Sequence, residues 1–200
     1  MKYCIENIKN IKDLDKNLSK IKTKKQNNIN KVKNINDKKR KILGEILFIK
    51  GLKKFYSINY NDINIKLNKN GKPYISDKKY KNINFNISHS HDYSICVFSN
   101  KKIGVDIEKI RNVNLNILNQ FATPNEISYV KSSKELILNN FFTIYTLKEA
   151  YFKMLGENLN NIKNVEFTIT KNKIFCSDSN VKLKTINNID GYIISICEKN

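Results

Sequence analysis

The stretch Ile103-Gly104-Val105-Asp106-Ile107-Glu108, together with Lys148-Glu149-Ala150-Tyr151-Phe152-Lys153 about forty residues later, decides how this chain is interpreted. The first stretch is a short β-branched run, so its two carboxylates at i and i+2 leave one face of a strand. In the second, Glu149 and Lys153 are four residues apart in a helical pattern and project from one side of a helix. Three carboxylates and a lysine brought together suit a Mg²⁺ ion that carries a phosphate ester, which indicates phosphoryl-type transfer.

Each of these pairs also has a simpler interpretation when it is taken alone. An acid-x-acid pair at a strand end is typical of a solvated edge, and Glu149 with Lys153 would form an ordinary surface salt bridge. His89 and His91 have the spacing of metal ligands, but the rest of a soft-metal site is absent from the sequence. The apolar surroundings of Asp106 and Glu108, and the apolar helix that carries the second pair, favour a shared site.

The composition is strongly basic, with a formal net charge of +19 over 200 residues. Such a charge suggests nucleic acid or another polyanion as a partner. Only Arg40 and Arg111 are arginines, however, and the lysines are interspersed with Asn and Ile along the whole chain. Because nucleic-acid surfaces usually use arginine for bidentate contacts, we interpret the charge as a biased, solvated surface that still attracts acidic ligands and proteins.

The four cysteines are far apart and contain no C-x-x-C pair, and the chain begins with no signal peptide. A zinc site or a disulfide framework is therefore not expected. No apolar run has the length that a bilayer span requires. We expect a reduced, soluble, cytoplasmic protein with no membrane partner.

The order of predicted elements indicates an α+β protein of two half-domains, residues 1–101 and 102–200. In the first half we expect an edge strand at 2–5, a weak helix at 14–21 and a polar loop or frayed helix at 22–28. A firm helix follows from a cap at Asp37 to Tyr56, then a turn at 70–74. Strands are predicted at 84–88 and 93–99.

The second half repeats the order of strand, helices and strands. After the strand with Asp106, short helices are predicted at 116–121 and 124–130, and a long helix from Ser133 to Leu155 that stops at Gly156. The runs 165–170, 173–176, 181–185 and 192–197 are predicted to form one antiparallel sheet.

Four motifs in order resemble the Sfp-type 4'-phosphopantetheinyl transferases. They are Gly71-Lys72-Pro73-Tyr74, Phe85-Asn86-Ile87-Ser88-His89-Ser90, Ile103-Gly104-Val105-Asp106-Ile107-Glu108-Lys109, and Phe142-x-x-Tyr145-Thr146-x-Lys148-Glu149-Ala150-Tyr151-x-Lys153-x-x-Gly156. The resemblance covers residues 37 to 160. It implies two similar α+β half-domains with the active site in the cleft between them.

The resemblance also implies an activity and a set of site residues. Members of this family move the 4'-phosphopantetheine arm of coenzyme A to a serine of an apo acyl or peptidyl carrier protein, with Mg²⁺, and release adenosine 3',5'-bisphosphate. By similarity, Asp106, Glu108 and Glu149 would hold Mg²⁺. Glu149 is also a candidate acceptor of the serine proton, directly or through a metal-bound water. Lys153 would stabilise the α-phosphate or protonate the leaving phosphate. Coenzyme A would contact a further set of residues, namely Lys25, Arg40, Lys41, Lys72, Pro73, Ser88 and His89.

Two departures from the family pattern stand out: His91 replaces the usual glycine, and Tyr145 replaces the usual tryptophan as a packing substitution. The family implies a monomer whose partners are coenzyme A and an acidic carrier protein, with no nucleic acid. Two alternatives stay open at this point. One is a basic nucleic-acid-binding protein, and the other is a family member that binds coenzyme A without activity.

Overall fold

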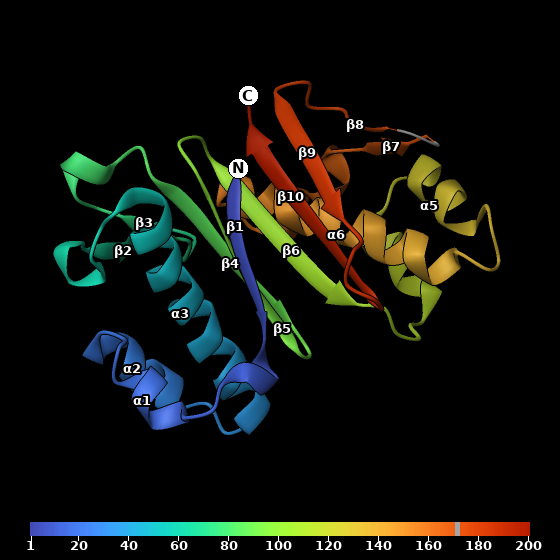
Figure 1. Ribbon diagram of the computed structural model, residues 1–200. Helices are drawn as coiled ribbons and strands as arrows, with labels where there is room; N and C mark the ends of the chain where they lie inside the picture. The colour runs from blue at the N-terminus through green and yellow to red at the C-terminus, as the bar shows by residue number, and fades with distance from the viewer. Residues whose placement is uncertain (171–172) are drawn as a thin grey trace.

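The computed structural model describes residues 1–170 and 173–200. Within them, each half of the chain forms a three-stranded antiparallel sheet packed against one long helix (Figure 1). The sheet of the first half has the order β1-β5-β4 and the sheet of the second half β6-β10-β9. The α+β architecture of two similar halves is thereby confirmed. The elements concerned are β1 Lys2–Asn7, α3 Ile35–Tyr56, β4 Asn84–Ser90, β5 Tyr93–Ser99, β6 Ile103–Lys109, α6 Ile137–Leu155, β9 Val181–Ile186 and β10 Tyr192–Lys199.

Smaller elements surround these two layers. The first half adds η1 Ile8–Asn10, α1 Leu14–Leu18, α2 Thr23–Asn30, η2 Tyr60–Asp62, the strands β2 Ile65–Leu67 and β3 Pro73–Ile75, and η3 Lys78–Tyr80. The second half adds η4 Leu115–Ile117, α4 Leu118–Phe121, α5 Pro124–Lys131, η5 Leu159–Asn164 and the strands β7 Phe167–Ile169 and β8 Ile174–Cys176. No helix in the described part of the chain is both long and apolar enough to cross a bilayer.

Neither long helix begins where the sequence predicted: α3 begins earlier and α6 begins later. Helix α3 starts at Ile35 because the Asn34 side chain accepts hydrogen bonds from the backbone N–H groups of Asn36 and Asp37, so Asp37 is not the cap. Helix α6 starts at Ile137 and not at Ser133. It stops as predicted at Gly156, whose φ of 72° is a left-handed conformation that glycine adopts at low cost.

Two further predictions are corrected by the structure. In the segment 22–28, expected as a polar loop or frayed helix, Lys22 is the N-cap residue and residues 23–28 belong to α2, which is held by the buried side chain of Ile29. The last four strands do not form one sheet: β7 and β8 are a separate hairpin, and β10 lies between β6 and β9. Most of β6 is buried, so its backbone N–H and C=O groups need hydrogen-bond partners. Strand β10 supplies them from Tyr192 to Glu198.

Strands β4 and β6 lie side by side where the two halves meet (Figure 1). Side-chain hydrogen bonds connect them. Alternate residues of β4 reach across: Asn86 Oδ1 accepts a bond of 3.0 Å from the Val105 N–H, and Ser88 Oγ donates to Asp106 Oδ1 at 2.8 Å. Ser90 Oγ continues the series with a bond of 3.0 Å to Glu108 Oε2. We call Asn86, Ser88 and Ser90 the polar ladder; it fixes β6 against β4 where no backbone ladder does.

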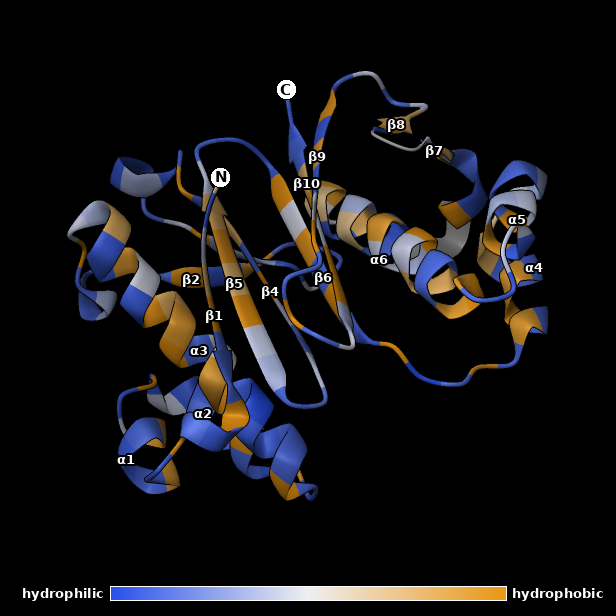
Figure 2. Cartoon of the chain, turned by 45° about the vertical axis from the view of Figure 1, so that its right-hand side comes forward, coloured by the Kyte–Doolittle hydropathy of each residue, from blue (hydrophilic) through white to orange (hydrophobic). Residues whose placement is uncertain are grey.

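Apolar side chains complete the junction. One core cluster takes residues from both halves, and Figure 2 shows hydrophobic residues along β5 and β6, on either side of the junction. The two halves therefore share a buried apolar surface. The buried members of this cluster are Ile95, Val97, Ile103, Val105, Ile107, Ile186, Tyr192, Ile194 and Ile196.

Gly104 lets β6 approach α6 backbone to backbone. A Cβ at this position would lie 2.0 Å from the Ala150 carbonyl oxygen and 2.3 Å from the Met154 nitrogen. Any side chain would therefore push α6 away from β6. The glycine sets the distance between the strand with Asp106 and the helix with Glu149.

We expect Gly104→Ala to destabilise the protein by about 3 kcal/mol, the upper end of the usual cost of overpacking, because the atoms in the way belong to the backbone. Urea unfolding followed by circular dichroism measures the change. Gly191→Ala is the matched control: its φ of 72° makes alanine strained, but nothing lies within 4 Å of the new methyl group. The control should cost about 1 kcal/mol, and equal losses for the two variants would contradict the close-approach argument.

A buried ion pair braces α6 in the second half. Lys148 Nζ lies 2.8 Å from Glu126 Oε2, and both side chains are fully buried. The ammonium also donates to the carbonyl oxygens of Ile162 and Val165, while Glu126 Oε1 accepts the Phe167 N–H. Burial lowers the pKa of Lys148, and the attraction of Glu126 opposes this. Every polar atom of the pair thus has a partner.

Removing one member should leave an uncompensated buried charge. We expect Glu126→Ala to lower the free energy of unfolding by about 3–5 kcal/mol, measured by urea titration at pH 7. Glu135→Ala, at an exposed position before the same helix, should change it by less than ~0.5 kcal/mol. An equal loss of unfolding free energy in both variants would show that the buried ion pair is no more important for stability than an exposed glutamate.

Candidate active site

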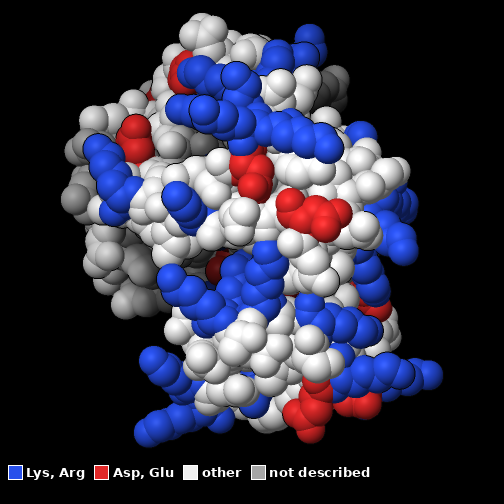
Figure 3. All heavy atoms as spheres, turned by 90° about the vertical axis from the view of Figure 1, so that its left-hand side faces the viewer, with Lys and Arg blue, Asp and Glu red and all other residues white. Residues whose placement is uncertain are grey.

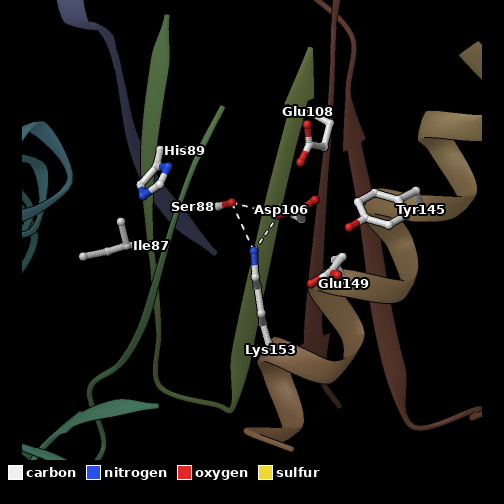
Figure 4. Close-up of a pocket in the computed structure, with 8 residues that line it drawn as sticks. All are labelled: Ile87, Ser88, His89, Asp106, Glu108, Tyr145, Glu149 and Lys153. Carbon is white, nitrogen blue, oxygen red and sulfur yellow. Dashed lines mark hydrogen bonds and ion pairs between the residues drawn. The ribbon is translucent and has the colours of Figure 1, made fainter. Parts of the chain in front are cut away.

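A cavity of about 220 Å³ lies between β4, β6 and α6 (Figure 4). It brings together the three acidic residues and the lysine that the sequence predicted to meet. Asp106 and Glu108 are therefore not simply a solvated strand edge, and Glu149 and Lys153 are not simply a surface salt bridge. The lining residues are Ile87, Ser88, His89, Asp106, Glu108, Tyr145, Glu149 and Lys153. We call this the acidic cavity.

The two secondary-structure periods place these side chains. Asp106 and Glu108 are two residues apart on β6 and share one strand face. Tyr145, Glu149 and Lys153 follow one another at intervals of four on α6 and share one helix face. The two faces meet because Gly104 brings strand and helix into contact.

Lys153 pairs with Asp106 across this contact. Its Nζ lies 2.6 Å from Asp106 Oδ1 and 3.2 Å from Ser88 Oγ (Figure 4). Burial raises the pKa of Asp106 to about 6, although the ammonium of Lys153 and the Ser88 hydroxyl lower it. Burial disfavours the charged form of Lys153, but the attraction of Asp106 prevails and the pKa of Lys153 is raised.

The other two carboxylates have different surroundings. Glu108 Oε2 accepts bonds from Arg111 at 2.9 Å and from Ser90 at 3.0 Å. Glu149 lies next to the Tyr145 phenol (Figure 4). Burial, followed by the charge of Glu149, raises the pKa of Tyr145. Tyr145 also packs on Phe121 with a centroid distance of 5.3 Å, so it fills the core and borders the cavity at once.

The donor set is chemically suited to a hard divalent cation such as Mg²⁺. Carboxylate oxygens are its preferred protein ligands, and Asp106 Oδ2 is buried without a hydrogen-bond partner among the described residues. No three His, Cys, Asp or Glu side chains of residues 1–170 and 173–200 lie close enough together to form a coordination shell. The fit to such an ion rests on the chemistry of the donor set and on the unpaired Oδ2 of Asp106.

A second and larger cavity of about 530 Å³ adjoins the first and shares Ile87 and His89 with it. Burial, and to a lesser degree the charge of Arg40, lowers the pKa of His89. Figure 3 shows a hollow with an acidic side chain in its depth and basic side chains along its rim. We call the larger, second cavity the basic cavity. Its lining residues are Lys25, Asn28, Ile29, Lys41, Glu45, Gly71, Pro73, Ile87 and His89.

The predicted coenzyme A residues are thus divided among several places. Lys25, Lys41, Pro73 and His89 line the basic cavity, and Ser88 lines the acidic one. Arg40 lines neither of them. Its guanidinium pairs with Asp37 and donates to the His91 carbonyl oxygen at 2.7 Å.

Lys72 lies in a setting that the sequence did not predict. Its Nζ donates to the carbonyl oxygens of Ile103 and Met154, both at 3.0 Å, and burial lowers its pKa to about 8. In the same hairpin, the amides of Asn68 and Asn70 donate to the Gly156 carbonyl oxygen at 3.2 and 2.8 Å. The β2–β3 hairpin therefore binds the C-terminus of α6, where unpaired carbonyl oxygens favour a cation.

His91, the departure from the family's glycine, keeps a glycine-like backbone. It occupies the β4–β5 turn with a φ of 46°, in the left-handed region. The backbone of His91 thus has a conformation that glycine adopts at lower cost. Among the residues that the sequence did not assign to the site, Glu45 and Ile87 border the cavities. Tyr145 also lines the acidic cavity. The one sequence signal for this was its spacing of four from Glu149, which puts both side chains on the same face of the helix.

Comparison with known families agrees with this arrangement. Residues 10–101 match a family model described as 4'-phosphopantetheinyl transferase, N-terminal, and residues 102–197 match the model of the 4'-phosphopantetheinyl transferase superfamily. The chain belongs to this superfamily. The Sfp-type resemblance of its motifs is confirmed.

Three relatives from bacilli illustrate the similarity. The 4'-phosphopantetheinyl transferase gsp of Aneurinibacillus migulanus is 34% identical over 161 residues, 80% of this chain and 65% of the relative. The transferase ffp of Bacillus subtilis is 32% identical over 148 residues, 74% and 65% of the two chains. Sfp of Bacillus subtilis strain 168 is 32% identical over 124 residues, 62% and 54%. The match thus spans less than two thirds of the length of each relative.

The buried carboxyl of Asp106 predicts a pH-dependent stability. Its pKa is raised to about 6, against about 3.9 for an unperturbed aspartate. The folded protein therefore binds this proton more tightly than the unfolded chain, and the free energy of unfolding falls as pH rises from 4 to 6. Asp106→Asn should be more stable than the wild type by about 1–3 kcal/mol at pH 8, with no difference below pH 4.

Urea unfolding between pH 4 and 8, without divalent metal, measures this effect. Asp62→Asn, at an exposed position, is the matched control and should leave the pH profile unchanged. A constant difference between Asp106→Asn and the wild type at all pH values would contradict the burial argument.

Proposed function

We propose that this protein transfers the 4'-phosphopantetheine arm of coenzyme A to a serine hydroxyl of an acyl or peptidyl carrier protein, with Mg²⁺, and releases adenosine 3',5'-bisphosphate. One observation carries the proposal: a cavity with three carboxylates and a lysine opens next to a cavity with two lysines, on a fold of this superfamily. The first suits a metal-bridged pyrophosphate, and the second suits a phosphorylated nucleotide.

In this proposal Asp106, Glu108 and Glu149 hold the ion, and Asp106 Oδ2 supplies an oxygen that no donor in residues 1–170 and 173–200 occupies. When bound, Mg²⁺ neutralises negative charge on the pyrophosphate as it develops. Glu149 also accepts the proton of the attacking serine hydroxyl. Lys153 stabilises the phosphate that is attacked, and its raised pKa keeps it charged at neutral pH. The residues act mainly by positioning and electrostatics.

The proposal includes several finer points. The halves meet after residue 101, where the two family models also adjoin. The protein acts as a monomer in the cytoplasm, and its free cysteines support the reducing compartment. Its partners are coenzyme A and an acidic carrier protein, which the net charge of +19 would attract, and neither nucleic acid nor membrane.

Mass spectrometry of apo carrier proteins tests the activity. After incubation with coenzyme A and Mg²⁺, a carrier should gain the mass of one phosphopantetheine arm at its serine. Glu149→Gln should lower the rate at least ~100-fold, the usual effect of removing a general base. Glu135→Gln, which lies outside both cavities, should keep the wild-type rate. No mass gain on any of several acyl and peptidyl carriers would refute the proposed activity.

A thermal shift assay separates a binding protein from an enzyme. Stabilisation by coenzyme A that increases with Mg²⁺, without any transfer, would indicate a family member that binds but does not react. Binding to DNA or RNA with a steep salt dependence and no response to coenzyme A would favour the nucleic-acid alternative.

A further inference from the structure

We propose that Glu45 makes this protein a poor discriminator between coenzyme A and its 3'-dephospho form, because it holds Lys25 in an ion pair inside the basic cavity. The inference rests on the proposed function, since it assigns the nucleotide end of coenzyme A to this cavity. It adds a substrate class: pantetheine donors with or without a 3'-phosphate. It also adds a specificity-determining residue.

The ion pair joins two helices at the wall of the cavity. Lys25 on α2 places its Nζ 2.6 Å from Glu45 Oε1 and 2.7 Å from Glu45 Oε2, on α3. The side chain of Lys25 is only 26% exposed, and that of Glu45 only 15%. Lys25 also lies 5.9 Å from the centroid of the Phe48 ring. Because both oxygens of the carboxylate bind one ammonium in a partly desolvated place, the pair is stronger than an exposed one.

The pair removes one of the few positive charges of the cavity. Among the described residues that line it, the cationic candidates are Lys25, Lys41 and His89. Burial and Arg40 lower the pKa of His89, so this ring is neutral near pH 7. Lys41 has no ion-pair partner in the described part of the chain and stays available. A cavity with two lysines thus offers one free positive charge.

A 3'-phosphate would meet this single charge with nearly two negative ones. If Lys25 turned toward the phosphate, it would leave Glu45 partly buried, unpaired and next to the anion. Both effects oppose binding of the phosphate. A donor without the 3'-phosphate leaves the Lys25–Glu45 pair undisturbed.

The remainder of the cavity suits the nucleoside itself. Ile29, Pro73 and Ile87 give it apolar walls, and Asn28 adds a polar amide. Its volume of about 530 Å³ is in the range of small-molecule sites. Most of the affinity for the nucleotide end would then come from these walls and not from the 3'-phosphate.

The test compares two donors and two glutamate variants. We expect the wild type to prefer coenzyme A to 3'-dephospho-coenzyme A by less than about tenfold in kcat/KM, and Glu45→Gln to increase this preference by roughly tenfold, the value of one charge-assisted hydrogen bond. The change should appear in KM, because the reacting end of the donor is unaltered. Glu6→Gln, which breaks the Lys50–Glu6 pair of 3.0 Å outside the cavity, is the matched control and should have no effect.

A binding measurement separates this inference from the proposed function. Calorimetry with adenosine 3',5'-bisphosphate and with adenosine 5'-monophosphate compares the same 3'-phosphate without any transfer. A ratio of affinities that rises in Glu45→Gln and not in Glu6→Gln supports the inference, even if no carrier is modified. An unchanged ratio in Glu45→Gln, or no binding of either nucleotide, overturns it.

Lys25→Met in the Glu45→Gln background provides a second test, because it replaces both members of the pair by uncharged side chains. If Glu45 neutralises Lys25 in the wild type, the double variant should keep the wild-type preference for the 3'-phosphate within about twofold. A collapse of this preference in the double variant would show that Lys25 binds the phosphate directly in the wild type, and the inference would be wrong.

Discussion

The contact of β6 with α6 at Gly104 is the constraint on which the site depends. A side chain there would overlap the backbone of Ala150 and Met154, so only glycine allows strand and helix to touch. With the contact in place, the period of two on β6 and the period of four on α6 bring Asp106, Glu149 and Lys153 to one cavity. A wider separation would break the 2.6 Å pair of Lys153 with Asp106 and leave two unrelated polar faces.

The first half of the chain fixes this contact from outside. The polar ladder of β4 positions β6, and the Asn68, Asn70 and Lys72 side chains of the β2–β3 hairpin hold the end of α6. Both attachments cross the boundary between the halves. The acidic cavity therefore needs both halves, although its carboxylates all come from the second. Lys72 belongs to one of the motifs but does not line the basic cavity. Its ammonium donates instead to the end of α6, where the last carbonyl oxygens of the helix have no intrahelical donors.

Sequence periodicity predicted the parts of the structure that local rules control. The strand with Asp106 and the helix that ends at Gly156 followed from spacing. The resemblance of the motifs identified the superfamily and implied that Glu149 meets Asp106. Tertiary partners decided the rest. The separate β7–β8 hairpin, the turn of Arg40 toward Asp37 and the pairing of Lys25 with Glu45 depend on neighbours that are distant in the chain or on a choice among many lysines. A composition so rich in lysine gives no signal by which one of them can be singled out.

The site and the fold make opposite demands on Asp106. The fold buries it between β4, β6 and α6, leaves Oδ2 without a partner among the described residues and raises its pKa to about 6. A carboxylate in such a place costs stability, and Lys153 offsets the cost only in part, since the pKa is still raised. A divalent cation would offset it much more strongly, because it brings two charges to an oxygen that no group of the described residues reaches. Burial that weakens the protein alone would therefore strengthen its binding of the ion that we propose.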